Sequence, residues 1–243
     1  MQGIFIAALI VTILSAGVIG GAIFWRAKAN ERKLLFVVTL VYIPIFFAAY
    51  YGLRLPLDSV LGPILSGYPV EFYQFVTLFY APITEELAKL SLLAVLLLAQ
   101  RIKKDNYHRF AFTVGLGFGI GEIWFLAELF AKQPQIASLP WYLLGGFITE
   151  RFLVCFLHGA FVLIAVHYLI KGQYRGILYA MGLHFAVNLP IYLAYITRDY
   201  IAAYIWQILL SYYVIIFALV MLVLTSRIIS ARRRAGSNRL NKR

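Results

Sequence analysis

Residues 3–25 read GIFIAALIVTILSAGVIGGAIFW, 23 consecutive residues without a charged side chain. A helix of about 20 such residues crosses the roughly 30 Å hydrocarbon core of a bilayer. No basic segment precedes this stretch and one follows it, which is typical of a retained span and not of a signal peptide. The stretch therefore predicts a membrane-spanning helix.

The rest of the chain has the same character. Its 243 residues are 63% hydrophobic and 13% charged, with a mean hydropathy of +0.84, whereas soluble domains are about 45–50% apolar and about 25% charged. This composition excludes a soluble domain, a disordered chain and a collagen-like repeat, and the single Cys155 excludes a disulfide scaffold. We expect an all-α polytopic membrane protein of about seven transmembrane helices, at residues 3–25, 34–53, 72–99, 110–131, 147–170, 176–197 and 201–225.

Positive charges alternate between the predicted loops. Of the 22 Lys and Arg residues, 17 lie in the segments 26–33, 101–109 and 171–175 and in the tail from Arg227. The intervening loops hold only Arg54, Lys132 and Arg198. By the positive-inside rule the N-terminus is outside and the C-terminus is cytoplasmic.

The chain shows no internal repeat and no soluble domain. We expect residues 1–243 to form a single integral-membrane domain, multi-pass in the cell membrane, with a short basic cytoplasmic tail at 226–243. The net charge of +12 then serves topology and contact with the anionic lipid of the bilayer, and we expect no nucleic acid partner.

Polar side chains inside the spans need a reason, because a charge at the centre of a bilayer costs at least about 2.5 kcal/mol. Seven positions stand out: Glu85, Glu86, Lys89, Glu122, His158, His184 and Asn188. Counted at about 1.5 Å per residue from the cytoplasmic helix ends, most of them lie at a similar depth of roughly 15 to 20 Å. Four helices of alternating direction would not place scattered structural residues in one layer, so the pattern predicts one shared site.

Spacing within the helices refines this hypothesis. Glu85 and Lys89 are four residues apart and can pair, while Glu86 is rotated by about 100°. His184 and Asn188 are also four apart and can address one substrate group. Which carboxylate is a support and which one reacts stays open.

Other local features lie around this layer. Pro82 and Pro190 each leave a helical carbonyl without its partner, those of Leu78 and Ala186, and the alternating glycines from Gly115 to Gly121 allow close helix contact. Glu128, Glu150 and Arg151 fall near the outer interface, where water and snorkelling make them tolerable, although Arg151 could still pair inward.

Four motifs occur in order along the chain: APITEELAK (81–89), GLGFGIGE (115–122), ERFLVCFLHGAF (150–161) and GLHFAVN (182–188). They resemble the motifs of the PrsW-type intramembrane proteases, within a wider group that includes the CAAX prenyl proteases and bacteriocin-processing relatives. In the first motif the prenyl proteases usually have an Arg one residue further on, where this chain has Leu90. The Lys at position 89 therefore favours the PrsW branch. The chain departs from that pattern at Ile123, where Asn is common, and Val154 replaces the Phe of the prenyl proteases.

The resemblance implies an intramembrane endopeptidase that acts on a membrane-tethered protein substrate without a cofactor. It implies a catalytic site made of Glu85, Glu86, Glu122, His158, His184 and Asn188. Within that set we expect Glu86 to act as general base, Glu85 and Glu122 to position water, and His184 with Asn188 to donate to the oxyanion. His158 would orient the water or a carboxylate.

Three alternatives stay open at this point. Two His residues and a Glu are a zinc ligand set, so a metal-dependent peptidase is the first. A CAAX-type prenyl endopeptidase is the second, and a proton-coupled transporter, which would also gather carboxylates and His at mid-depth, is the third. The sequence indicates neither the identity of the substrate nor the oligomeric state.

Overall fold

The computed structural model describes residues 2–25, 27–103 and 105–240. For residues 232–240 it describes the backbone and not the side chains. Within these residues every regular element is a helix, so the all-α prediction is confirmed for this part of the chain. The elements are α1 (Gly3–Ser15), η1 (Ala16–Gly20), α2 (Gly21–Phe24), α3 (Ala29–Ala49), η2 (Tyr50–Arg54), α4 (Leu55–Leu65), α5 (Val70–Leu98), α6 (Tyr107–Ala131), α7 (Pro134–Ala137), η3 (Trp141–Leu144), α8 (Gly145–Leu169), α9 (Arg175–Ile196) and α10 (Ala203–Leu240).

Six helical units in the described residues are long and apolar enough to cross a membrane, which indicates a multi-pass membrane protein. They are Gly3–Phe24, Ala29–Leu65, Tyr107–Ala131, Trp141–Leu169, Arg175–Ile196 and Ala203–Ala231. The remaining predicted span, 72–99, forms the 29-residue α5. Three charged residues in its middle, Glu85, Glu86 and Lys89, set it apart from the six apolar helices. A total of seven spans therefore stays a prediction.

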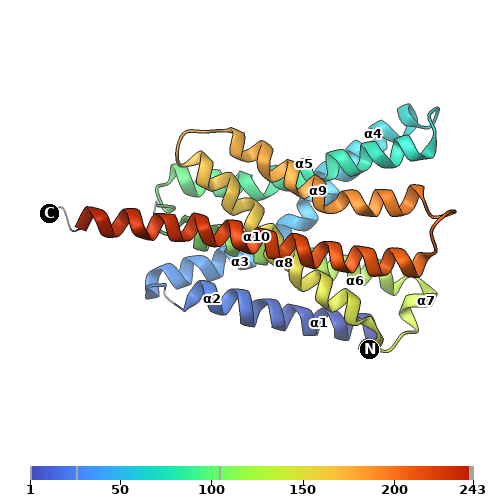
Figure 1. Cartoon of the computed structure of the whole chain (residues 1–243), viewed down its shortest axis with the longest axis horizontal. Coiled ribbons are helices and arrows are strands. Elements are labelled where there is room, and N and C mark those ends of the chain that lie inside the picture. Colours follow the sequence, from blue (N-terminus) through green and yellow to red (C-terminus); the bar gives the residue numbers. More distant parts are fainter. Residues whose placement is uncertain (1, 26, 104, 241–243) are drawn as a thin grey trace.

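The helices run back and forth along one axis (Figure 1). The α2–α3, α5–α6 and α8–α9 connections and the C-terminus lie at one end, and the N-terminus with the α4–α5, α6–α8 and α9–α10 connections lies at the other. The basic segments of the sequence thus gather at one end of the bundle. We call this the basic end, and the opposite one the N-terminal end.

Two helix boundaries differ from the sequence prediction. The second helix does not end near residue 53 but continues through the π-helical turn η2 into α4. Pro56, which cannot donate a backbone hydrogen bond, follows directly after the π-helical turn, where the regular α-helical hydrogen-bond pattern is already interrupted. Arg54, predicted in a loop, therefore lies inside a helix. Likewise, α10 extends to Leu240 through much of the predicted tail, which is rich in the strong helix formers Ala and Arg.

α6 is the central helix of the packed half of the bundle, with 72% of its apolar window buried. Its glycines explain why. A Cβ on Gly115 would collide with the backbone of Gly159 in α8, and a Cβ on Gly117 would collide with the backbone of Thr39 in α3. Residues two apart in a helix point to nearly opposite sides, so the alternating glycines let α6 approach both neighbours closely.

α9 and α10 are packed more loosely, with 17% and 22% of their apolar windows buried. They are tied at the proline that the sequence singled out. Pro190 cannot donate to the carbonyl of Ala186, and the hydroxyl of Tyr213 in α10 donates to that oxygen at 2.8 Å. The hydrogen bond joins α9 to α10 about half a turn beyond His184.

Candidate functional site

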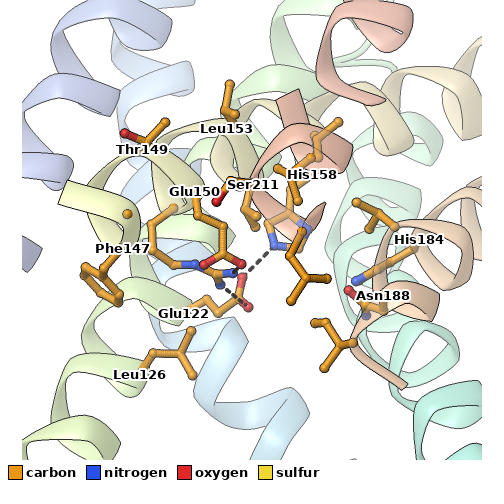
Figure 2. Close-up of a pocket in the computed structure, with 18 of the residues that line it drawn as sticks. Glu122, Leu126, Phe147, Thr149, Glu150, Leu153, His158, His184, Asn188 and Ser211 are labelled. Carbon is orange, nitrogen blue, oxygen red and sulfur yellow. Dashed lines mark hydrogen bonds and ion pairs between the residues drawn. The ribbon is translucent and has the colours of Figure 1, made fainter. Parts of the chain in front are cut away.

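A cavity of about 1090 Å³ lies between α5, α6, α8, α9 and α10. Five of the six predicted site residues line it: Glu85, Glu122, His158, His184 and Asn188. The sixth, Glu86, is fully buried beside the cavity and does not line it. Figure 2 shows the Glu122 carboxylate directed toward His158, with His184 and Asn188 close together on a neighbouring helix.

The cavity lies in one half of the bundle. Its walls come from the N-terminal halves of α5, α8 and α10 and from the C-terminal halves of α6 and α9. All of these half-helices lie toward the N-terminal end (Figure 1). The cavity therefore lies in the half of the bundle opposite to the basic end.

The adjacent carboxylates Glu85 and Glu86 have different surroundings. Glu86 Oε1 accepts from Lys89 Nζ at 2.7 Å. Glu85 is farther from the same ammonium, at 4.0 Å, and its side chain is 14% exposed. The Oε2 atoms of both residues are buried and have no hydrogen-bond partner, but Glu85 lines the cavity and Glu86 does not. The pairing of Glu85 with Lys89 suggested by their spacing is thus the weaker of the two contacts, and Glu85 is the carboxylate left free at the cavity wall.

His184 is oriented by Glu86. Its Nδ1 lies 2.8 Å from Glu86 Oε1. A carboxylate paired with an ammonium can only accept, so Nδ1 carries the proton of this hydrogen bond. In the neutral ring Nε2 is then an acceptor, and it lies 3.7 Å from Glu85 Oε2. The ring also stacks on Phe161 at a centroid distance of 5.5 Å, which limits its rotation.

Lys89 is fully buried and connects the two histidines. Besides Glu86, its Nζ lies 2.8 Å from His158 Nδ1 and 4.5 Å from the centre of the Phe118 ring. The ammonium has no acceptor capacity, so His158 Nδ1 accepts and the opposite nitrogen, Nε2, carries the proton. That Nε2 donates to Glu122 Oε2 at 2.8 Å. Both ring nitrogens of His158 are therefore in use.

Arg151 also belongs to the cavity, although the sequence placed it near the outer interface of the membrane. It is buried, lines the cavity, and its guanidinium joins Glu122 Oε1 at 2.8 Å to Glu150 Oε1 at 2.6 Å. Both oxygens of Glu122 are thereby bonded. The sequence did allow Arg151 to pair toward the inside of the bundle. Arg151 lies two helical turns from His158 on α8, so the two side chains share one face of that helix.

Arg54 is a second cavity residue that the sequence did not assign to the site. The sequence placed it in a loop because the apolar run stops there. Its position in η2 depends on the continuation of the helix to Leu65, which no local pattern announced.

A metal ion could be held by Glu85, His158 and His184, whose ligand atoms all lie within 4.8 Å of one another. Glu85 and His184 fit this role, since Glu85 Oε2 and His184 Nε2 face each other and Glu86 supports the far side of the His184 ring. His158 fits poorly: to ligate a cation it must give up its bond to Lys89 or to Glu122. A metal ion bound here would therefore replace one of the two hydrogen bonds of His158.

No protein-family model matches the chain, and no curated protein or solved structure shows significant similarity to it.

Proposed function

We propose that this chain is an intramembrane endopeptidase that hydrolyses peptide bonds of membrane-tethered proteins with a water activated by Glu85. One observation carries the proposal. Glu85 Oε2 has no hydrogen-bond partner and lies 3.7 Å from His184 Nε2 at the wall of a cavity large enough for a peptide segment. Two acceptors at this separation can share one water, and a water held between two acceptors directs its oxygen lone pairs outward.

The reaction follows from these contacts. Glu85 takes a proton from the water as the oxygen attacks the scissile carbonyl carbon, and the same proton then passes to the leaving amine. The carbonyl oxygen gains negative charge, which the Asn188 amide can stabilise from the cavity wall. The products are a carboxylic acid, which keeps the second proton of the water until it ionises, and an amine, and Glu85 returns to its ionised form.

The supporting residues hold this arrangement. Glu86 fixes the His184 ring, Lys89 compensates the buried charge of Glu86, and His158 with Arg151 holds Glu122. The role of general base thus moves from Glu86, the residue expected from the sequence, to Glu85. His184 moves from oxyanion donor to water acceptor, because its Nδ1 proton already belongs to the bond with Glu86.

In this proposal α5 is a seventh membrane-crossing helix. Its charged residues Glu85, Glu86 and Lys89 face one another and His184, so they point into the bundle and not into lipid. The basic end is cytoplasmic in the cell membrane, and the cavity opens toward the outside. The test is labelling of single introduced cysteines in intact cells: Ser138→Cys should react with an impermeant reagent, and Lys171→Cys should not.

The activity is tested with purified protein in liposomes against a panel of single-span peptides that includes a prenylated CAAX peptide, with cleavage followed by mass spectrometry. Glu85→Gln keeps the shape of the side chain but cannot take a proton, so the initial rate should fall about 100-fold or more. Glu128→Gln, an exposed residue outside the cavity, is the matched control and should retain the wild-type rate.

Three outcomes would contradict the proposal. Cleavage that a chelator abolishes and zinc restores would favour the metal-dependent reaction. A wild-type cleavage rate in Glu85→Gln would exclude Glu85 as the general base. Proton-dependent flux in liposomes without cleavage of any peptide would favour a transporter.

A further inference from the structure

Arg54 lies in an unusual backbone segment. It is the last residue of η2, a π-helical turn within the continuous helix Ala29–Leu65. Wide turns of this kind are rare and occur frequently at functional sites. Here the turn lies where the helix passes the cavity, and Arg54 lines the cavity together with Glu85.

Arg54 forms no close ion pair within the described residues. Its guanidinium packs over the face of the Tyr50 ring at 5.7 Å, and it interacts with the carboxylate of Glu85 only beyond ion-pair distance. Its Nε is buried and has no hydrogen-bond partner. A buried charged donor without an acceptor is costly and marks a place where an anion would be favourable.

The other cavity arginine, Arg151, also has a buried Nε without a hydrogen-bond partner, but it differs from Arg54 in its ion pairs. Arg151 is held by Glu122 and Glu150 at 2.8 and 2.6 Å, so its charge is already neutralised. Within the described residues, Arg54 is thus the cavity-lining cation that remains available to a ligand.

The space next to Arg54 limits what can reach it. A second cavity of about 10 Å³ is lined by Arg54, Glu85, Thr84 and Tyr50 among others, which is room for about one water and not for a side chain. A larger anion must therefore approach the guanidinium from the main cavity, on the side where Glu85 also faces it. An anion bound there lies within a few residues of the bond that Glu85 would attack.

We infer that Arg54 is a specificity-determining residue that binds a carboxylate of the substrate close to the scissile bond. This inference rests on the proposed peptidase function and names its substrate class: membrane-tethered chains with an acidic residue, or their own C-terminus, a few residues from the cleavage site. A guanidinium binds a carboxylate through two parallel hydrogen bonds, which gives strength and direction.

The test uses full-length protein in nanodiscs and a single-span probe of about 20 Leu and Ala residues. One series carries Asp at successive positions near one end of the probe, and a second series carries Asn there. A third series compares a free C-terminus with an amide, which separates the two sources of the carboxylate. Cleavage rates are measured for wild type, Arg54→Gln and Arg54→Lys, with Lys132→Gln as the control that removes an exposed positive charge outside the cavity.

We expect the wild type to prefer one Asp position, or the free C-terminus, by about 10- to 100-fold over its neutral counterpart. Arg54→Gln should abolish that preference through a higher KM while neutral probes keep their rate, and Arg54→Lys should retain part of it. Lys132→Gln should retain all of it. Equal losses for acidic and neutral probes in Arg54→Gln would overturn the inference, because Arg54 would then act on Glu85 or on the fold.

A binding experiment separates failure of this inference from failure of the proposed function. The Glu85→Gln protein, which should not cleave, is titrated with the fluorescently labelled Asp and Asn probes. Tighter binding of an acidic probe that Arg54→Gln removes supports the carboxylate site even if the wild type cleaves nothing. Equal affinity for both probes would overturn it.

Discussion

The two sides of the site are built differently. On the α6–α8 side, glycine contacts bring the helices together, and Glu122 has both oxygens bonded, one to Arg151 and one to His158. On the α5–α9 side, Glu85 Oε2 and His184 Nε2 face each other at 3.7 Å without a hydrogen bond. The helix α9 is also far less buried than α6. In the proposed function, the α6–α8 side supports the site, and Glu85 on the α5–α9 side, which has no close ion pair, carries the chemistry; this second side is called the unpaired side below.

The largest effect is expected at the residue that joins the two sides. Lys89→Met leaves the fully buried Glu86 without its ammonium, and breaking a buried ion pair in this way costs about 3–5 kcal/mol. Steric trapping in bicelles measures the free energy of unfolding. The double variant Lys89→Met/Glu86→Gln should recover part of the loss, and a single variant as stable as wild type would show that the pair does not hold the site.

Asn188→Ala tests whether the unpaired side performs chemistry. Loss of an oxyanion donor lowers kcat by about 100-fold, or about 2.7 kcal/mol, without an equal loss of stability. Asn188→Asp should be equally slow because a carboxylate cannot donate. Cleavage rate and unfolding are measured on the same preparations, and a loss of stability without a change in kcat would move Asn188 to the supporting residues.

A pair of glycines compares the packing of the two sides. Gly115→Ala in α6 meets the backbone of Gly159 and should destabilise the protein by about 1–3 kcal/mol. Gly182→Ala in α9 meets no atom within 4 Å and should leave stability unchanged or raise it by up to about 1 kcal/mol. Equal effects in a thermal or denaturant titration would mean that the α6–α8 contact is not the tighter one.

The smallest effect concerns the bond between α9 and α10. Tyr213→Phe leaves the Ala186 carbonyl, freed by Pro190, without a donor, and should cost about 1 kcal/mol. Tyr212→Phe, its exposed neighbour, is the matched control. Hydrogen exchange of α9 should increase in Tyr213→Phe only. Unchanged exchange would show that the loosely packed side does not depend on this bond.

Much of the architecture could be predicted from local sequence. The all-helical fold and the convergence of carboxylates and histidines follow from apolar run length and from depth counting, because a helix advances by a constant rise per residue. The same arithmetic failed at Arg54 and Arg151. Depth counting places a Cα and not the end of a long side chain, and a charged residue at the end of an apolar run looks like a loop even when the helix continues.

The amino-acid sequence by itself predicted a helical membrane protein and a small set of Glu, His and Asn residues that come together within it. Only the tertiary structure decided which members of that set are bonded to each other. Glu85 and Glu86 are neighbours with the same chemistry, and what separates them is that Lys89 and His184 both reach Glu86. Those contacts depend on the rotation of α5 against α9 and on side-chain rotamers, which the spacing of residues along one helix does not specify.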